Sequence, residues 1–364
     1  MKLVVFGLTV SSSWGNGHAT LWRGLIKALA AQGHRTVFFE RDVPYYAGAR
    51  DCLALPNGEL VLYSDWRDIA LRARAELADA DAAIVTSYCP DGIAAGDLVC
   101  DSPRALKVFY DLDTPVTLAR VARGESLPYL GPRGLTDFDL VLSYTGGGAL
   151  DQLKASLGAG RVVPLYGHVD PDVHRLQASQ PHYRADLSYL GTYSADRQAG
   201  LESLLINVAR RRPFARFLIG GAQYPDDFPW APNIYFVRHL PPSEHPAFFC
   251  SSRLTLNVTR QAMAKIGWCP SGRLFEAAAC GTPVITDVWP GLTDFFTPDD
   301  EIVAAGSADD VLAALDRDDA EVARIGRAAR ERTLTEHTSA RRATELVAAL
   351  GMADRAAAPK LVEA

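Results

Sequence analysis

The sequence lacks features that would have pointed to several common classes of protein. Its 364 residues contain no run of about 18 apolar residues, so no transmembrane helix is expected. They carry a formal net charge of −6, so no general basic field is present to attract nucleic acid or an anionic membrane. We find no internal repeat, and residues 352–364 lack periodicity and are expected to form a mobile tail.

Cysteine is scarce and has no metal-binding pattern. No CxxC pair occurs, so buried thiols are expected rather than a zinc site, and no metal is predicted. The six cysteines are Cys52, Cys89, Cys100, Cys250, Cys269 and Cys280. The first expected strand, residues 3–6, has only Lys2 as an early charge, which leaves no room for a signal peptide. We therefore expect a cytoplasmic protein.

Strands and helices alternate along the first half of the chain, which predicts a parallel sheet covered on both faces. The expected strands are residues 3–6, 36–39, 60–63, 82–86, 106–110, 140–143 and 162–164. The expected helices are residues 19–31, 68–78, 91–100, 115–122 and 148–157.

The alternation stops at residues 167–181, rich in proline, histidine and polar residues, which we interpret as an interdomain linker. A second alternation follows. Its expected strands are residues 187–190, 216–219, 234–237, 254–258, 284–286 and 301–304. Its expected helices are residues 196–209, 245–250, 273–280, 308–315, 321–333 and 339–350. The prediction is an α/β protein of two Rossmann-like, doubly wound domains facing a cleft, at residues 1–170 and 171–338, with residues 339–364 forming a last helix and the tail.

One stretch organises the second half: residues 270–291, PSGRLFEAAACGTPVITDVWPG. Ser271 can cap a helix, Gly281 can end it in the left-handed conformation, and Pro283 prevents it from resuming. The helix start offers free N–H groups to a phosphate, and Glu276, one turn further, can accept hydrogen bonds from a vicinal diol such as ribose. The alternatives are a plain capping Ser271 and a Glu276 that only favours the helix dipole.

The string FEAAACGTPVI resembles the nucleotide-sugar signature of retaining GT-B glycosyltransferases of family four. The strings SSSWGNGHATLWRGLIKAL, FFERDVPYYAGARD, FYDLDTPVTL and LSYTGGGAL resemble more narrowly the CgeB-like (spore maturation protein CgeB-type) branch. The resemblance implies a GT-B fold whose last helix crosses back to the first domain. It implies transfer of a sugar from a UDP-, GDP- or dTDP-linked donor to an unknown acceptor, with retention of configuration and without a metal or other cofactor.

The resemblance places the donor on the second domain. Glu276 would bind the ribose, and Ser271, Gly272 and Arg273 would meet a phosphate. The loop from Gly191 to Arg197 follows an expected strand and enters a helix, which suits a phosphate. Basic side chains would take the charge of the leaving diphosphate, and the candidates are Arg197, Arg260 and, less favoured, Lys265.

The chain departs from the family at Trp268. Many family-four enzymes carry another Glu there, with seven residues between it and the equivalent of Glu276. The acidic contact to the donor sugar is therefore missing or moved, which leaves open a protein that binds nucleotide sugars without turning them over. A GT-B-fold nucleotide-sugar epimerase is a further alternative.

The acceptor would enter over the loop after the first strand. Gly15, Asn16, Gly17 and His18 lie there, and His18 could bond a sugar hydroxyl or carry a proton as a catalytic residue. The other reading of this loop is a glycine turn with a capping residue. Further candidates at strand ends are Asp111, Asp113, Tyr45 and residues 144–148.

Two other motifs fit less well. Gly15-x-Gly17-x-x-Thr20 with Glu40 approaches a dinucleotide fingerprint for NAD or FAD, but the third glycine is absent and the loop is too long. Asp111-x-Asp113 matches the metal-binding DxD of other glycosyltransferases. GT-B chemistry can neutralise the leaving group with a helix dipole and basic side chains instead, so we expect no metal there.

Overall fold

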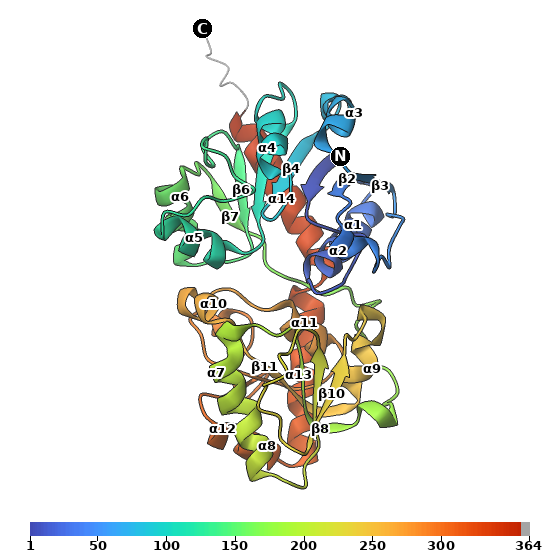
Figure 1. Ribbon diagram of the computed structural model, residues 1–364, viewed down its shortest axis with the longest axis vertical. Helices are drawn as coiled ribbons and strands as arrows, with labels where there is room; N and C mark the ends of the chain where they lie inside the picture. Colours follow the sequence, from blue (N-terminus) through green and yellow to red (C-terminus); the bar gives the residue numbers. More distant parts are fainter. Residues whose placement is uncertain (358–364) are drawn as a thin grey trace. The chain divides into compact units, whose positions relative to one another are not determined.

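The computed structural model describes residues 1–357, which form two compact units (Figure 1). The first unit contains Met1–Ser13, His18–Tyr166 and helix α14 (Ser339–Ala357). The second contains Trp14–Gly17 and Gly167–Thr338. Helix α14 continues to Ala357, so residues 352–357 of the expected mobile tail are helical, and residues 358–364 lie outside the described residues.

The first unit is built on a fully parallel sheet in the order β3-β2-β1-β4-β5-β6-β7. The strands are β1 (Lys2–Gly7), β2 (Arg35–Arg41), β3 (Gly58–Tyr63), β4 (Ala82–Thr86), β5 (Leu106–Asp111), β6 (Leu140–Ser143) and β7 (Val162–Pro164). The helices are α1 (His18–Ala31), α2 (Pro44–Ala47), α3 (Trp66–Ala78), α4 (Gly92–Cys100), α5 (Thr114–Ala122) and α6 (Gly148–Leu157). Their apolar stripes cover the sheet, and α14 packs against α1 and β5.

The second unit repeats this arrangement in the order β10-β9-β8-β11-β12-β13, again fully parallel. The strands are β8 (Ala185–Leu190), β9 (Phe217–Gly221), β10 (Ile234–Arg238), β11 (Ser252–Asn257), β12 (Val284–Thr286) and β13 (Val303–Ala304). The helices are α7 (Gln198–Leu201), α8 (Asn207–Arg211), α9 (His245–Cys250), α10 (Gln261–Ile266), α11 (Gly272–Ala279), α12 (Ala308–Leu315) and α13 (Asp319–Glu336). The predicted fold class, two Rossmann-like parallel-sheet domains, is confirmed.

Several local predictions differ from the structure. The helix expected at residues 196–209 consists of a 3-10 turn (Ala195–Arg197), α7, a π-helical turn (Glu202–Ile206) and α8. Helix α10 was not predicted, because its six residues carry no buried apolar stripe. Residues 167–181 are not a free linker: they belong to the second unit, and His174 within them is only 1% exposed.

Within residues 1–357, no helix combines the length and the apolar character that a membrane span requires.

The long loop after β1 is held by one buried carboxylate. Glu40, at the end of β2, is 1% exposed. Its two oxygens accept hydrogen bonds from the backbone N–H groups of Val10 and Ser11, at 2.7 and 2.9 Å, and from the hydroxyl groups of Thr9 and Ser11. All four donors lie in residues 9–11, so Glu40 fixes the path of the loop towards α1. In the dinucleotide-binding alternative, Glu40 stood where a ribose-binding acid would lie. Its carboxylate instead accepts these four hydrogen bonds from the loop.

Replacing this carboxylate should destabilise the first unit. In Glu40→Gln the amide NH₂ would face at least one of the donors, leaving it without an acceptor, so the free energy of unfolding should fall by about 2 to 4 kcal/mol. Urea unfolding measures this loss. Glu59→Gln on the neighbouring strand β3 is the control, because the Glu59 side chain is 41% exposed and should lose less than about 1 kcal/mol. Equal losses in the two variants would contradict the role of Glu40.

Candidate functional site

The strand order of the second sheet creates a switch point between β8 and β11. The strands that follow β8 in the chain are added on one side of it, and β11 and the strands after it lie on the other side. Ligands of open parallel sheets bind beyond the carboxyl ends of the strands at such a point. Two loops leave the sheet there: residues 191–197 follow β8, and residues 258–260 follow β11. Both had been predicted to carry donor-binding residues.

Three guanidinium groups gather at this edge. Burial lowers the pKa of Arg197, and the nearby positive charges of Arg273 and Arg260 lower it further. Arg260 pairs with the Asp196 carboxylate at 2.9 Å, and Arg273 donates to Asn257 at 2.8 Å. The structure therefore brings together three of the predicted donor-binding residues, and Asp196 pairs with one of them, Arg260. The arrangement has an excess of positive charge that suits a diphosphate.

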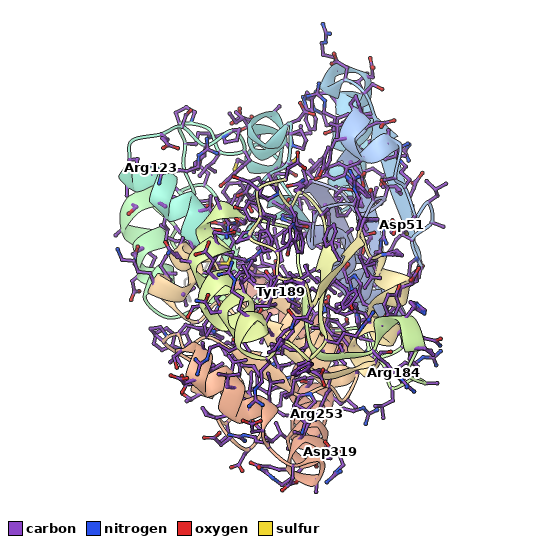
Figure 2. The ribbon with its side chains drawn as sticks, turned by 60° about the horizontal axis from the view of Figure 1, so that its bottom comes forward. Asp51, Arg123, Arg184, Tyr189, Arg253 and Asp319 are labelled. Atoms are coloured by element: carbon purple, nitrogen blue, oxygen red, sulfur yellow. The ribbon has the colours of Figure 1, made fainter. Side chains whose placement is uncertain are left out.

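Two buried donors at the same place lack hydrogen-bond partners among residues 1–357: the hydroxyl of Tyr189 and the Nε of Arg197. Tyr189, labelled in Figure 2, lies on β8, and the Arg273 guanidinium carbon sits 5.2 Å from the centre of its ring. A Cβ added at Gly191 would come within 2.8 Å of both the Arg273 guanidinium and the Tyr189 hydroxyl. Gly191 therefore leaves room for these two groups. Buried donors without partners are costly, and an anion could satisfy them.

Helix α11 presents Glu276 from the same edge. Its apolar face is buried through residues including Leu274, Phe275 and Ala278, while the Glu276 side chain remains 15% exposed. Gly281 follows the helix with a φ of 72°, the left-handed conformation that the sequence predicted for the helix end. Ser271 occupies the N-cap position, but its side chain makes no capping hydrogen bond. The backbone N–H groups at Gly272 therefore begin the helix without a side-chain cap.

Two polar residues that the sequence analysis missed support the arginines. Asn257 is fully buried at the end of β11, where it accepts from Arg273 and donates to the Thr286 hydroxyl at 3.0 Å. Asp287 accepts from both the backbone N–H and the hydroxyl of Thr259, each at 2.9 Å, next to Arg260. Burial raises the pKa of Asp287, against these hydrogen bonds. A polar residue at the end of the apolar run RLTLN was the signal available for Asn257.

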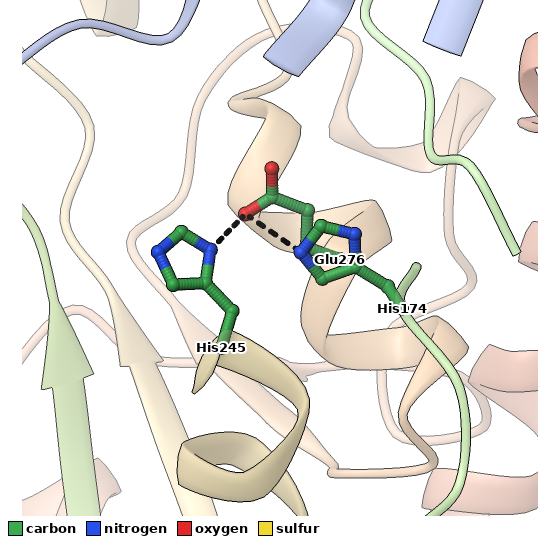
Figure 3. Close-up of side chains that lie close together, drawn as sticks. All are labelled: His174, His245 and Glu276. Atoms are coloured by element: carbon green, nitrogen blue, oxygen red, sulfur yellow. Dashed lines mark ion pairs between the residues drawn. The ribbon is translucent and has the colours of Figure 1, made fainter. Parts of the chain in front are cut away.

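Two histidines flank Glu276 and were also missed (Figure 3). The Nε2 of His174 lies 4.0 Å and the Nδ1 of His245 lies 3.9 Å from the same oxygen, Oε2. Burial lowers the pKa of each histidine to about 4, so both rings are neutral at pH 7. No motif surrounds His174 or His245, so their proximity could not be predicted from the sequence.

Lys265 and Trp268 lie on the chain between Arg260 and α11. Lys265, the less favoured phosphate candidate, is exposed on α10. Trp268 has a φ of 44°, and its indole N–H donates to the Asp294 carboxylate at 2.7 Å. The position where many family-four enzymes carry a Glu therefore holds a tryptophan, whose indole is hydrogen-bonded to the carboxylate of Asp294.

In the first unit, the predicted residue His18 begins α1 at the equivalent switch point, between β1 and β4. Its ring meets the ring of Tyr88 edge-on, with centroids 5.9 Å apart, and its buried Nδ1 has no hydrogen-bond partner among residues 1–357. Burial lowers the pKa of His18 to about 4. Tyr88, which the sequence analysis missed, has a φ of 64° and donates its hydroxyl to Asp113 at 3.0 Å. A neutral histidine, a tyrosine and a carboxylate are thus brought together.

Asp111 lies next to this group but is fully buried. Its carboxylate accepts from the Asp113 N–H and the Thr117 hydroxyl, at 3.2 and 3.0 Å, and burial raises its pKa to about 6. Asp111 is therefore shielded from solvent at the strand end, and its acceptor-side role stays a prediction. Among residues 1–357, Asp111 and Asp113 do not belong to any cluster of three metal-ligating side chains.

The remaining acceptor-side candidates are distributed differently from the prediction. Residues Trp14–Gly17, which include Gly15, Asn16 and Gly17, group with the second unit, where the Trp14 ring lies 3.9 Å from the ring of His239. The expected boundary had placed them in the first domain. Tyr45 is 50% exposed on α2, and residues 144–148 connect β6 to α6.

Residues 197–348 match the model of a family described as "Glycosyl transferase-like". This segment starts at Arg197 and includes Arg260, Arg273 and Glu276, but it is less than half of the chain. No curated protein sequence matches the chain.

Several solved structures are similar over almost the whole chain. A sucrose-phosphate synthase from Thermosynechococcus elongatus is 14% identical, with a TM-score of 0.69, over 98% of this chain and 99% of that one. HepE from Anabaena in complex with UDP-glucose is 12% identical, with a TM-score of 0.66, over 97% and 100%. An alpha-glucosyltransferase in complex with UDP and a 13-mer DNA is 14% identical, with a TM-score of 0.68, over 96% and 99%. The chain has the GT-B fold of these glycosyltransferases.

The arginine group makes a prediction for a minimal ligand, inorganic diphosphate. Losing one charge-assisted contact should weaken diphosphate binding by about 10- to 100-fold in Arg197→Gln. Titration calorimetry at fixed ionic strength measures this affinity. Arg210→Gln is the control, because Arg210 is exposed on α8. Equal affinities in the two variants would remove Arg197 from the anion site.

His18 makes a prediction for acid sensitivity. Because its pKa is about 4 in the folded chain and about 6.5 when unfolded, the unfolded state takes up a proton that the folded state refuses as pH falls through this window. The free energy of unfolding should therefore fall as the pH drops from about 6.5 to about 4, and His18 should have no such effect above about pH 6.5. Urea midpoints at about pH 7 and pH 5 should differ less in His18→Gln than in the wild type. The exposed His182→Gln should keep the wild-type difference, and a wild-type difference in His18→Gln would contradict the assignment.

Proposed function

We propose that the chain is a glycosyltransferase that takes its sugar from a nucleoside diphosphate donor, with a UDP-sugar as the first candidate. The observation that carries the proposal is the group of three arginines with two partnerless buried donors at the β8–β11 switch point. The family match over residues 197–348 and the UDP and UDP-glucose named for similar structures support the same reading. GDP- and dTDP-linked donors are the alternatives.

In the proposed mechanism, the second unit binds the donor and stabilises the leaving group. The diphosphate lies against Arg197, Arg260 and Arg273, whose charges are in place before the reaction and need no reorganisation as negative charge develops. The Tyr189 hydroxyl and the first N–H groups of α11 add donors. Glu276 accepts hydrogen bonds from the ribose hydroxyls. We expect these arginines, rather than a metal ion, to neutralise the leaving diphosphate.

We expect the transferred sugar to retain its anomeric configuration, as the resemblance to family four implies. The anomeric coupling in the NMR spectrum of the product would test this expectation. His18 is the residue proposed to meet the acceptor, since its neutral ring can accept a proton or a hydrogen bond from a sugar hydroxyl. Membership of the CgeB-like branch remains part of the proposal, supported by the N-terminal strings.

Glu276 provides the sharpest test of the donor assignment. Glu276→Gln keeps the shape of the side chain but loses the charge that binds a diol, so its affinity for UDP should fall by about 10-fold or more. Its affinity for inorganic diphosphate should stay within about twofold of the wild type, because diphosphate has no ribose. Calorimetry with EDTA in all samples compares the two ligands. Unchanged UDP affinity in Glu276→Gln would remove the central contact of the proposal.

A protein that binds nucleotide sugars without turnover is the second candidate, and Trp268 favours it. The indole occupies the position of the missing Glu, so the usual acidic contact to the sugar is lost unless another group supplies it. Incubation with UDP-glucose separates the candidates: transfer or slow hydrolysis indicates the enzyme, and thermal protection without either indicates binding alone. A changed sugar that stays attached to the nucleotide would indicate an epimerase.

A further inference from the structure

Two histidines and a carboxylate, with side chains 1 to 15% exposed, lie close together beside the proposed donor site. His174, His245 and Glu276 each offer one ligand atom, and these atoms lie within 4.8 Å of one another. In residues 1–357 no other group of three histidine, cysteine or acidic side chains meets this condition. The three residues come from different parts of the second unit: the segment before β8, the start of α9 and the middle of α11.

The hydrogen bond of His245 fixes which nitrogen faces the carboxylate. Its Nε2 lies 3.2 Å from the carbonyl oxygen of Leu240, to which it can only donate. In a neutral ring, Nδ1 then carries a lone pair, and this lone pair faces the carboxylate oxygen Oε2 of Glu276 at 3.9 Å. Two acceptors that face each other repel unless a proton, a water molecule or a metal cation lies between them, and a metal cation can bind both lone pairs directly. A backbone carbonyl holding the outer nitrogen is also the usual support of a metal-binding histidine.

His174 completes the triangle. Its side chain is 1% exposed, and neither ring nitrogen has a hydrogen-bond partner among the described residues. Its Nε2 lies 4.0 Å from the same Glu276 oxygen. Leaving both nitrogens of a buried imidazole without partners is costly, and a metal ion would satisfy one of them.

We propose that His174, His245 and Glu276 bind one divalent zinc-type ion. Two imidazole nitrogens and one carboxylate oxygen are a known zinc ligand set, with a fourth position left open. Zinc bonds to these atoms are about 2.0 to 2.2 Å long, so tetrahedral ligand atoms lie roughly 3.3 Å apart. The two distances from the histidines to Oε2 of Glu276, 4.0 and 3.9 Å, need to shorten by less than about 1 Å. No pair of the three atoms, which lie within 4.8 Å of one another, needs to shorten by more than about 1.5 Å, and side-chain rotations can supply this. Imidazole ligands favour zinc over magnesium.

The site is compatible with the donor contact but does not depend on it. Both histidines face Oε2, and Figure 3 shows the other oxygen of Glu276 turned away from the two rings. The ion would hold the carboxylate through Oε2 and leave Oε1 to accept from a ribose hydroxyl. The charge of a leaving diphosphate would still be met by the arginines.

Metal titration of the whole chain tests the proposal. Protein stripped with EDTA and dialysed should bind one zinc ion per chain by calorimetry, and cobalt(II) in its place should give the visible absorption of a four-coordinate site. Magnesium should give neither signal. Zinc affinity should fall by at least about 100-fold in His245→Gln and in Glu276→Gln, because each loses a ligand. Both replacements are similar in size to the originals, so they test the site even if a His174 variant fails to fold.

Two controls exclude other zinc ligands. His182→Gln removes an exposed histidine and should bind zinc like the wild type. Cys250→Ser is needed because Cys250 ends α9, the helix that His245 begins, and its thiol contacts the Cys280 carbonyl oxygen at 3.4 Å. This variant too should bind zinc like the wild type. The proposal is overturned if the wild type binds no zinc, or if Cys250→Ser abolishes binding while His245→Gln keeps it. UDP binding measured in EDTA is a separate result, so either proposal can fail without the other.

Discussion

The second unit holds three positive charges close together at one edge of its sheet, and most of the site depends on this constraint. Burial lowers the pKa of Arg197, and the neighbouring positive charges of Arg273 and Arg260 lower it further, because like charges repel. The fold maintains them through neutral and acidic partners: Asn257 for Arg273 and Asp196 for Arg260. An anion would relieve this repulsion, which is why we propose that a diphosphate binds at this edge.

The sequence was most informative where a local pattern determines the structure. The apolar runs and the glycine and proline signals placed the strands of both sheets within a few residues, and the turn at Gly281 was predicted with its left-handed conformation. The parallel topology then carried Arg197 and Arg260 to the same edge, because loops at the carboxyl ends of neighbouring strands must emerge together. The functional roles of these residues came from the family resemblance and remain predictions.

Contacts between distant segments could not be predicted in this way. His174 was assigned to a linker because its neighbours are polar and proline-rich, yet it is buried beside Glu276. The role of Glu40 depends on four donors in a loop about thirty residues earlier, and acidic residues at strand ends are common in any parallel sheet. Tyr88 was missed because a positive φ at a tyrosine leaves no trace in the sequence. The contacts of these side chains depend on the tertiary structure and could not be predicted from local sequence patterns.

Helix α14 has a consequence for the order in which the chain can fold. Its residues Ala343, Leu346 and Leu350 are part of the apolar core of the first unit, together with Trp22 on α1. All of the second unit from Gly167 to Thr338 precedes this helix in the chain. During synthesis the N-terminal sheet is therefore made early but lacks part of its core until the last helix emerges. The later unit can reach its native packing first, and the ribosome finishes the earlier one last.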